Sequence, residues 1–151
     1  MNWHAKTYAQ LSKDELYAIF KARVDVFVVE QNCPYPEIDD IDIADHTQHL
    51  FLLSGNELMA YARCYRKSDT CAAIGRVLVA APARGKGIAK NLMLRAIECC
   101  EQHIAHQQLE IAAQCYLDGF YTELGFVKQG EEYLEDGIPH QDMVLRKSTV
   151  K

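Results

Sequence analysis

The sequence lacks any long apolar run: nothing in its 151 residues approaches the roughly 20 apolar residues of a membrane-spanning helix. Its first residues, MNWHAKTYAQ, lack the charged and then apolar order of a signal peptide, so we expect a cytoplasmic protein without a membrane partner. A basic excess is also missing. The 16 Lys and Arg residues against 21 Asp and Glu give a net charge of −5, which argues against a nucleic-acid partner.

Signals for metals and disulfides are equally weak. The six cysteines include no C-x-x-C pair, so we expect no structural zinc and no other metal. Without a secretory signal, reduced and mostly buried thiols are the expectation. The sequence also has neither of two familiar phosphate-binding fingerprints, G-x-G-x-x-G and G-x-x-x-x-G-K-[ST]. Any phosphate site must therefore be built in another way.

Hydrophobic periodicity and turn signals predict one continuous domain over residues 1–151. Ser12, followed three residues later by Glu15, has the pattern of a capping box at a helix start, and Gly125 is expected to end the last helix. We expect strands at 4–9, on both sides of Gly55-Asn56 within 49–65, and at 71–80, 109–114, 126–134 and 142–147, with helices at 11–31, 87–104 and 117–124. This order belongs to the α/β class of the α+β type, with a mixed, largely antiparallel sheet.

The segment PARGKGIA, residues 82–89, lies between a predicted strand and a predicted helix. The first amides of a helix have no partner within it and lie at the positive end of its dipole. Gly85 and Gly87 would let a pyrophosphate approach these amides, and Arg84 and Lys86 would add positive charge. On the loop alone, an ordinary turn with solvated cations explains the residues equally well.

Two further motifs favour the phosphate interpretation. RVLVAAPARGKGIAKNLM resembles the acetyl-coenzyme A signature R/Q-x-x-G-x-G/A of the GCN5-related N-acetyltransferases (GNAT), with Arg84, Gly87 and Ala89 at its fixed positions. Downstream, GFYTELGF resembles the F-Y-x-x-L-G-F segment of that superfamily, and VEQNCPYPEID and EDGIPH resemble its ElaA-like branch. The resemblance covers most of the chain. It implies a GNAT-like sheet of about six to seven strands flanked by helices on both faces.

The resemblance implies an N-acetyltransferase with acetyl-CoA as co-substrate, in which the amine attacks the thioester directly and no acyl-enzyme forms. Backbone groups of the strand before the loop, which splays from its neighbour, would hold the pantetheine arm, and the amides of the loop would hold the pyrophosphate. The coenzyme-binding residues implied in this way are Leu78, Val79, Arg84, Gly85, Lys86, Gly87, Ile88, Ala89 and Gln114. Gln114 and Leu117 stand where many members carry Asn and Ala.

By the same resemblance, Tyr121 is the candidate general acid, because a phenol can protonate or hydrogen-bond the departing thiolate. The alternative role for it is packing in an amphipathic helix. His140 is our candidate general base, since an imidazole titrates near neutral pH and this one follows a turn-forming Gly-Ile-Pro. Glu30 and Glu37 are alternatives. Cys115 is the one thiol placed where a rival nucleophilic mechanism could use it.

The expected partner is a primary amine on a small molecule or a peptide. The loop at 32–48 holds five acidic residues that either attract a cationic amine or form an ordinary solvated face: Glu37, Asp39, Asp40, Asp42 and Asp45. A non-catalytic acyl-CoA sensor of the same fold is the alternative function. An ATP-dependent enzyme ranks last, because no Ser or Thr follows Lys86 to reach magnesium. A homodimer also stays open.

Overall fold

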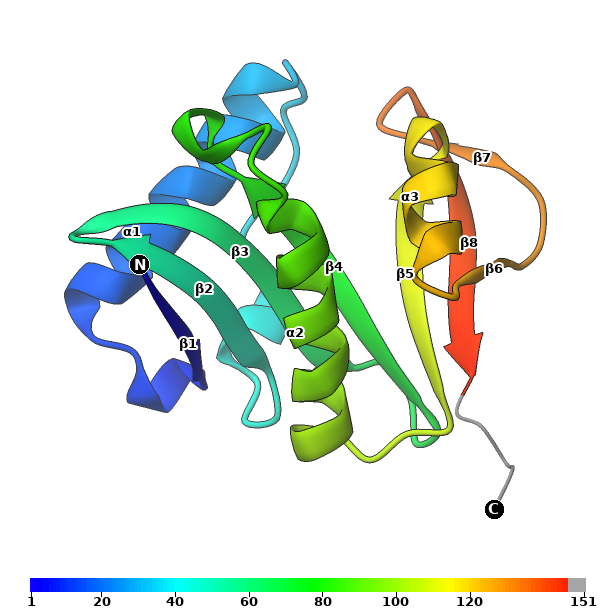
Figure 1. Ribbon diagram of the computed structural model, residues 1–151, viewed down its shortest axis with the longest axis horizontal. Coiled ribbons are helices and arrows are strands. Elements are labelled where there is room, and N and C mark those ends of the chain that lie inside the picture. Colours follow the sequence, from blue (N-terminus) through cyan, green and yellow to red (C-terminus); the bar gives the residue numbers. More distant parts are fainter. Residues whose placement is uncertain (147–151) are drawn as a thin grey trace.

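The strands of this protein form one mixed, largely antiparallel sheet. A computed structural model describes residues 1–146, in which eight strands follow the order β1-β2-β3-β4-β5-β8-β6, with β7 paired to β8 (Figure 1). They are β1 (Asn2–Lys6), β2 (Gln48–Ser54), β3 (Glu57–Arg66), β4 (Cys71–Val79), β5 (Gln108–Gln114), β6 (Val127–Lys128), β7 (Tyr133–Glu135) and β8 (Ile138–Arg146). Within this sheet β4 and β5 are the parallel pair, and the other neighbours are antiparallel. The predicted fold class is confirmed.

Helices cover both faces of the sheet, as predicted. The α-helices are α1 (Lys13–Arg23), α2 (Ile88–His103) and α3 (Asp118–Glu123), and α1 continues into the π-helical η2 (Val24–Glu30). The 3-10 turns are η1 (Tyr8–Gln10), η3 (Asp40–Ile43), η4 (Ala81–Ala83) and η5 (Cys115–Leu117). In Figure 1, α1 lies behind β1–β3 and α2 crosses in front of the sheet. None of the helices within residues 1–146 combines the length and the apolarity of a membrane span.

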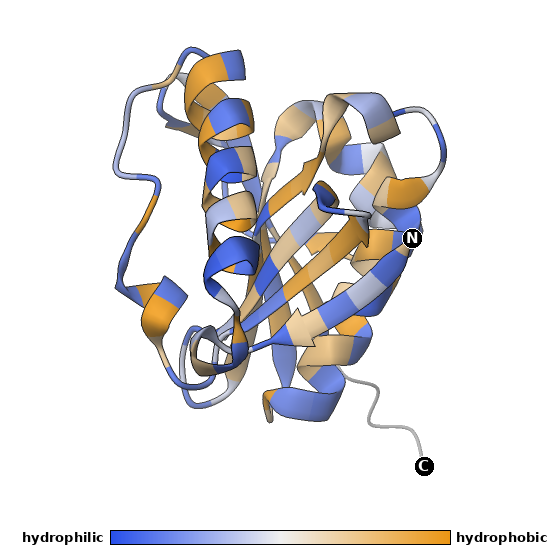
Figure 2. Cartoon of the chain, turned by 90° about the vertical axis from the view of Figure 1, so that its left-hand side faces the viewer, coloured by the Kyte–Doolittle hydropathy of each residue, from blue (hydrophilic) through white to orange (hydrophobic). Residues whose placement is uncertain are grey.

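Each face of the sheet has its own hydrophobic core. The smaller core, on the α1 side, contains Ile19, Phe51, Leu58, Tyr61 and Leu78. The larger core lies under α2 and α3, and there the predicted apolar stripe of α2 is buried at Leu92, Met93, Ala96, Cys100 and Ile104. Figure 2 shows hydrophobic and hydrophilic bands alternating along the helices, the pattern expected when one side of each helix packs on the sheet.

The capping box at the start of α1 is confirmed. The backbone N–H of Glu15 donates to Ser12 Oγ at 3.0 Å, and the backbone N–H of Ser12 donates to Glu15 Oε1 at 2.9 Å. The predicted helix over 11–31 is regular only to Arg23, after which the wider η2 follows. The η2 sequence, VDVFVVE, is rich in β-branched valine, which loses side-chain freedom in a regular α-helix.

Several predicted strand boundaries were wrong. The first strand ends at Lys6 and not at residue 9, because the N–H of Thr7 donates to Gln10 Oε1 and η1 forms instead. The segment 126–134 splits into β6 and β7 around Gly130, whose φ of +76° interrupts an extended chain, so the sheet has eight strands and not six to seven. The last strand begins at Ile138 and not at 142, and Lys147 lies outside the described residues.

The sheet divides between β4 and β5. These strands pair at only three positions, Cys71–Ala73 with Gln108–Glu110, and β5 then continues alongside β8 as far as Gln114 opposite His140. The remaining arms, residues 74–79 of β4 and 111–114 of β5, have no strand pairing with each other, and Figure 1 shows them diverging. We call these two arms the fork. We call residues 82–89 the glycine loop. The predicted splay of the strand before this loop is therefore present.

Candidate active site

The β4 arm of the fork presents an open backbone edge. The N–H of Ala80 donates to Met59 O at 2.8 Å, which makes this a hydrogen-bonded position of the β3–β4 ladder. Because such positions alternate, the backbone groups of Leu78 point to β3 and those of Val79 point to the fork. Arg84 Nε donates to Val79 O at 2.8 Å, so Val79 offers its N–H but not its carbonyl. Leu78 pairs with Tyr61 of β3, so its own N–H and carbonyl do not belong to the open edge. That edge is formed by the residues on either side of Leu78.

The glycine loop ends in an uncapped helix. Gly87 is the N-cap of α2 with φ of +76°, and no side chain caps the first amides of the helix. A Cβ atom on Gly85 or Gly87 would meet no atom within 4 Å, so positive φ, and not crowding, explains both glycines in this structure. The start of α1 is different, because Ser12 Oγ caps it by accepting from the N–H of Glu15. The start of α2 is thus free to receive an anion.

The two cations of the loop are arranged differently. The exposed Arg84 side chain turns back, and its Nη2 donates to Glu30 Oε1 at 3.0 Å, which joins the end of β4 to η2. Lys86 is exposed and forms no ion pair with any residue in 1–146. Of the two loop cations, Lys86, and not Arg84, is therefore still available at this helix start.

Tyr121 lies in α3 within the larger core, and only 7% of its surface is exposed. Its ring meets those of Phe120 and Phe126 edge-on, with centroids 5.1 and 6.0 Å away. Burial, with a smaller contribution from Tyr116, raises the pKa of Tyr121 to about 12. Its hydroxyl makes no hydrogen bond to a residue that the structure describes. Tyr121 is therefore a neutral phenol with a hydrogen bond to give.

His140 lies on β8 next to the tip of the β5 arm, opposite Gln114. Its Nδ1 is 2.7 Å from the carbonyl oxygen of Ile138, which can only accept, so Nδ1 carries the proton and Nε2 has the free lone pair. Glu135 Oε2 is 3.4 Å from Nε2, and the ring stacks on that of Tyr133. A protonated His140 would therefore have a carboxylate beside it.

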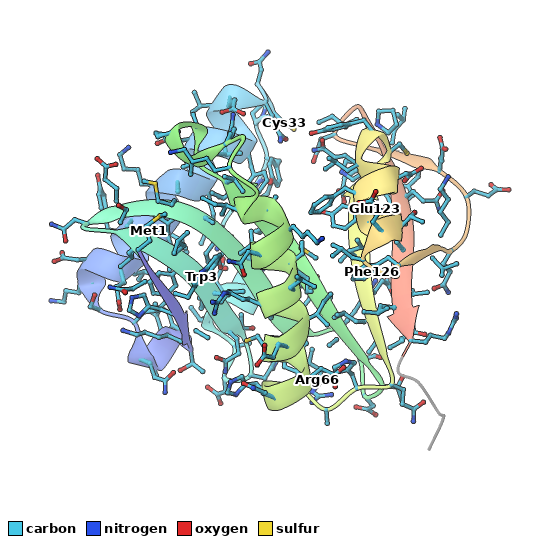
Figure 3. The ribbon with its side chains drawn as sticks, in the orientation of Figure 1. Met1, Trp3, Cys33, Arg66, Glu123 and Phe126 are labelled. Atoms are coloured by element: carbon cyan, nitrogen blue, oxygen red, sulfur yellow. The ribbon has the colours of Figure 1, made fainter. Side chains whose placement is uncertain are left out.

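Tyr121 and His140 lie on opposite faces of the sheet. Met143 belongs to the core that holds Tyr121, and alternate residues of a strand point to opposite faces, so His140 points to the other side. Gln114 shares the side of His140, because its neighbour Ala113 is in the Tyr121 core. In Figure 3, the labelled Cys33 lies on the side of the β4 arm and the labelled Glu123, on α3, lies on the side of the β5 arm.

Comparison with known proteins agrees with this geometry. Residues 9–147 match the family model described as an acetyltransferase (GNAT) domain. The chain belongs to the GNAT family. It is 39% identical over 145 residues to protein ElaA of Escherichia coli (strain K12), covering 95% of each chain, which confirms the ElaA-like branch.

Two solved structures of such relatives are also similar. An acyl-CoA N-acyltransferase from Pseudomonas aeruginosa superposes with a TM-score of 0.91 and 39% identity, covering 95% of this chain and 98% of the other. The crystal structure of Escherichia coli ElaA gives a TM-score of 0.91 and 38% identity, covering 97% and 100%. The fork, the loop and the flanking helices of this GNAT protein thus form an acyltransferase fold.

The acidic loop of this GNAT chain is divided: Asp40 and Asp45 are exposed, whereas two other carboxylates face the interior. Glu37 and Asp42 are buried, and Arg23 donates to both, from Nε to Glu37 Oε2 at 2.7 Å and from Nη1 to Asp42 Oδ1 at 2.6 Å. Both interpretations offered from the sequence are wrong for these two carboxylates. Burial alone would raise the pKa of Asp42, but the hydrogen bond and charge of Arg23 outweigh burial and lower it.

Three arginines that neutralise this loop were missed from the sequence: Arg23, Arg63 and Arg76. Each occurs inside an apolar run, in AIFKARV, MAYARCY and AAIGRVLV respectively. A cation in an otherwise buried run needs a carboxylate partner, because an unpaired buried charge is strongly disfavoured. These three interruptions, taken together with the acid-rich loop, were the available signal.

The cysteines give no support to a thiol nucleophile. Cys99 and Cys100 are buried in α2. Cys115 is half-buried in η5, where desolvation and the nearby Glu132 and Asp118 raise the pKa of its thiol. A raised pKa lowers the thiolate fraction that such chemistry requires.

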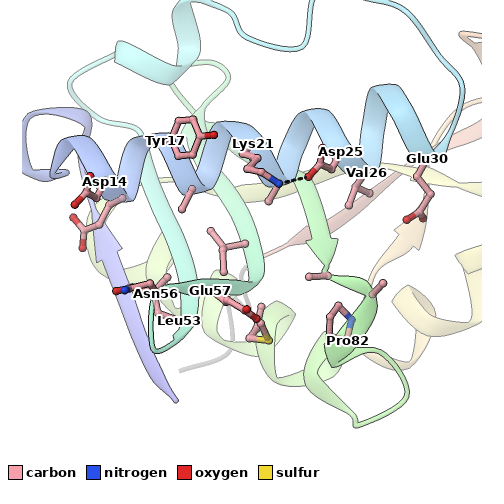
Figure 4. Close-up of a pocket in the computed structure, with 17 residues that line it drawn as sticks. Asp14, Tyr17, Lys21, Asp25, Val26, Glu30, Leu53, Asn56, Glu57 and Pro82 are labelled. Carbon is pink, nitrogen blue, oxygen red and sulfur yellow. Dashed lines mark hydrogen bonds and ion pairs between the residues drawn. The ribbon is translucent and has the colours of Figure 1, made fainter.

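A groove of about 730 Å³ lies along α1 (Figure 4). Its walls come from α1, from the β2–β3 turn at Asn56 and from residues 80–82. Lys21 Nζ donates to Asp25 Oδ2 at 3.0 Å on its rim. No residue of either fork arm lines the groove, which meets the glycine loop only at Pro82, so it does not coincide with the predicted coenzyme site.

Proposed function

We propose that this GNAT protein is a cytoplasmic N-acetyltransferase that moves the acetyl group of acetyl-CoA to a primary amine on a small molecule or a peptide. The observation that carries the proposal is the fork: the open edge of β4 leads directly into the glycine loop and the uncapped start of α2. A thioester arm along the edge and a pyrophosphate at the helix start are the two ends that such a site would hold.

Coenzyme binding would rest on the backbone more than on side chains. The N–H of Val79 would donate to the thioester carbonyl oxygen, which becomes more negative in the transition state. The amides of Ile88 and Ala89, at the positive end of the 16-residue α2, would donate to the pyrophosphate. Lys86 would add charge there, whereas Arg84 is already engaged by Glu30.

In the proposed reaction the amine nitrogen bonds to the acetyl carbon and the carbon–sulfur bond breaks, with no acyl-enzyme between. Tyr121 would stabilise the departing thiolate. Its pKa is about 12, against about 8.5 for a free thiol, so the phenol keeps its proton at equilibrium. Tyr121 would therefore act by donating a hydrogen bond to sulfur, and the thiolate would take its proton from solvent.

A primary amine with a pKa of about 10 is mostly protonated at neutral pH and must lose a proton before it attacks. His140 would accept that proton at Nε2, directly or through water, and Glu135 would stabilise the resulting imidazolium. Because His140 and Tyr121 lie on opposite faces, the amine would arrive on the α1 side while sulfur leaves on the α3 side. With the incoming amine and the departing sulfur on different sides, the amine could reach the acetyl carbon directly while the sulfur leaves.

The test compares the thermal midpoint of the protein alone, with acetyl-CoA, with CoA and with ATP–magnesium, because specific binding to the native state raises the midpoint. We expect stabilisation by acetyl-CoA and CoA, and release of thiol from acetyl-CoA when primary amines are added. If ATP–magnesium raises the midpoint and acetyl-CoA does not, the proposal is refuted. Binding of acetyl-CoA with no thiol released across a broad amine panel would favour the sensor.

A further inference from the structure

Arg76 occupies an unusual backbone position at the fork. Its φ is +53°, in the left-handed region that favours glycine. The β3–β4 register shifts at this point, from Arg63 opposite Gly75 to Tyr61 opposite Leu78, so Arg76 lies in a β-bulge. A non-glycine residue in this conformation costs about 1 kcal/mol or more and persists only when its surroundings hold it.

The Arg76 side chain is held at two points by one residue. Its Nε donates to Glu37 Oε2 at 2.9 Å, and its Nη2 donates to the backbone carbonyl oxygen of Glu37 at 3.0 Å. The guanidinium also lies over the ring of Tyr35, 5.5 Å from the centroid, and the Tyr35 hydroxyl donates to Glu37 Oε1. We call Tyr35, Glu37 and Arg76 the clamp.

The clamp is anchored in the buried interior. Arg23 grips the same two groups of Glu37, with Nε donating to Oε2 at 2.7 Å and Nη2 donating to the carbonyl oxygen at 2.9 Å. Arg23 is fully buried and is bound to Asp42 as well. Movement of Glu37 would therefore remove one of the two carboxylate partners of a buried charge, which is disfavoured. The clamp thus ties the β4 bulge to α1 through a rigid ion network.

The clamp acts where β4 has little other support. Pairing with β5 ends at Ala73, and from there to Val79 the strand is held on one edge only, by β3. Arg76 lies in the segment between Gly75 and Leu78 in which the register with β3 shifts. The direction of the following edge, with the N–H of Val79, therefore depends on the conformation of the bulge.

We propose that Arg76 is a positioning residue of this protein: the clamp holds the β4 bulge in its left-handed conformation and so aligns the open edge at 77–79 with the acyl thioester. The effect of the clamp on thioester alignment rests on the proposed function, whereas the effect of the clamp on the β4 bulge does not. A displacement of about 1 Å at reacting groups can cost about a hundredfold in rate, so this alignment matters to catalysis.

The test uses Arg76→Gly, which keeps positive φ without strain and deletes the grip, and Arg76→Lys, which keeps the charge. Lysine has one terminal nitrogen and lacks the planar fork with which Nε and Nη2 reach the carboxylate and the carbonyl of Glu37 together. Arg66→Gly is the matched control, because it deletes a β3 arginine bound to the carbonyls of Ser68, Asp69 and Ala105, away from the bulge. Amide hydrogen exchange of residues 74–80 is measured in the free protein, and the Kd of acetyl-CoA by calorimetry, well below each melting temperature.

We expect exchange over 74–80 to rise about tenfold in Arg76→Gly and in Arg76→Lys, and the Kd of acetyl-CoA to rise about tenfold, with Arg66→Gly unchanged in both. Unchanged exchange in Arg76→Gly, or an equal rise in Arg66→Gly, would overturn the inference. If the wild-type protein does not bind acetyl-CoA, the proposed function fails while the exchange comparison still decides the clamp. If Arg76→Gly does not fold, Tyr35→Leu decides it by the same exchange measurement.

Discussion

Tyr121 illustrates how burial sets the chemistry of a single residue. Its phenol is enclosed by two aromatic rings, and the resulting rise of its pKa to about 12 keeps it neutral at every physiological pH. A neutral phenol without a hydrogen-bond partner among the described residues gains most when an anion forms next to it. A departing thiolate is such an anion.

Tyr121→Phe should therefore lower kcat about 100-fold while the Kd of acetyl-CoA stays nearly the same, because the hydrogen bond would form mainly in the transition state. Steady-state kinetics with calorimetric binding checks both values. Tyr116→Phe is the control, since that side chain is 79% exposed and should leave both unchanged. An unchanged kcat in Tyr121→Phe, where chemistry limits the rate, would remove Tyr121 from catalysis.

Arg23 is the residue whose loss should cost most stability. Arg23→Met leaves the buried carboxylates of Glu37 and Asp42 without a main partner, and breaking such a pair costs about 3–5 kcal/mol. Urea unfolding measures this loss. Lys21→Met, two residues earlier on the same helix, removes an exposed pair with Asp25 and should cost far less, because solvent screens such a pair. Similar losses in the two variants would show that the buried network contributes little.

At the scale of elements, the two long helices start in different ways. At the start of α1, Ser12 caps the N–H of Glu15, whereas α2 begins at a glycine that has no side chain to offer. The first amides of a helix have no partner within the helix. Where no side chain accepts from them, water or a ligand must do so. The second helix therefore gives up a capping interaction and leaves its first amides free for the anion of the proposed site.

Gly87→Ala should destabilise the protein by about 1–2 kcal/mol, because alanine is strained at φ of +76°, and it should weaken acetyl-CoA binding as the first turn shifts. Thermal unfolding and calorimetry measure the two effects. Gly119→Ala, in α3 with no positive φ and open space around it, should be neutral or stabilising and should leave binding unchanged. Equal stability of the two variants would contradict the role given to positive φ.

For the whole molecule, the buried ion network links stability to pH through two groups. Burial, helped by the charges of Arg23 and Arg63, lowers the pKa of His49 from its ordinary 6.5, against the opposing hydrogen bond and charge of Asp42. Its Nε2–H donates to the Asp42 carbonyl oxygen, and its Nδ1 accepts from the Tyr61 hydroxyl. The folded protein thus holds His49 neutral.

Stability should fall as pH drops below about 6.5, because the unfolded chain then takes up a proton at His49 that the folded chain refuses. A second fall should follow below about pH 4, because the stability due to the lowered pKa of Asp42 is lost as that group is protonated. Melting temperature against pH measures both. His49→Gln keeps a donor and an acceptor but cannot titrate, so it should flatten the curve between pH 5 and about 6.5; an unaltered slope would exclude His49.

The predictions that held depend on neighbours in the chain. Ser12 reaches Glu15 three residues away, and Gly125 ends α3 through its own φ of +100°. The stripe of α2 repeats within one helix. The wrong prediction that the first strand extends over residues 7–9 also concerns neighbours in the chain. One side-chain contact decides it: Gln10 accepts from the N–H of Thr7, and this bond competes with strand formation.

The sequence by itself determined the order of most elements, the glycine start of α2 and the membership of the GNAT family, because these depend on local patterns and motifs along the chain. Only the tertiary structure decided that Glu37 and Asp42 are neutralised by Arg23 and that Tyr121 and His140 face opposite sides of the sheet. These outcomes depend on pairing between distant elements and on burial, which together decide which carboxylate a buried arginine meets and which face of the sheet a side chain occupies.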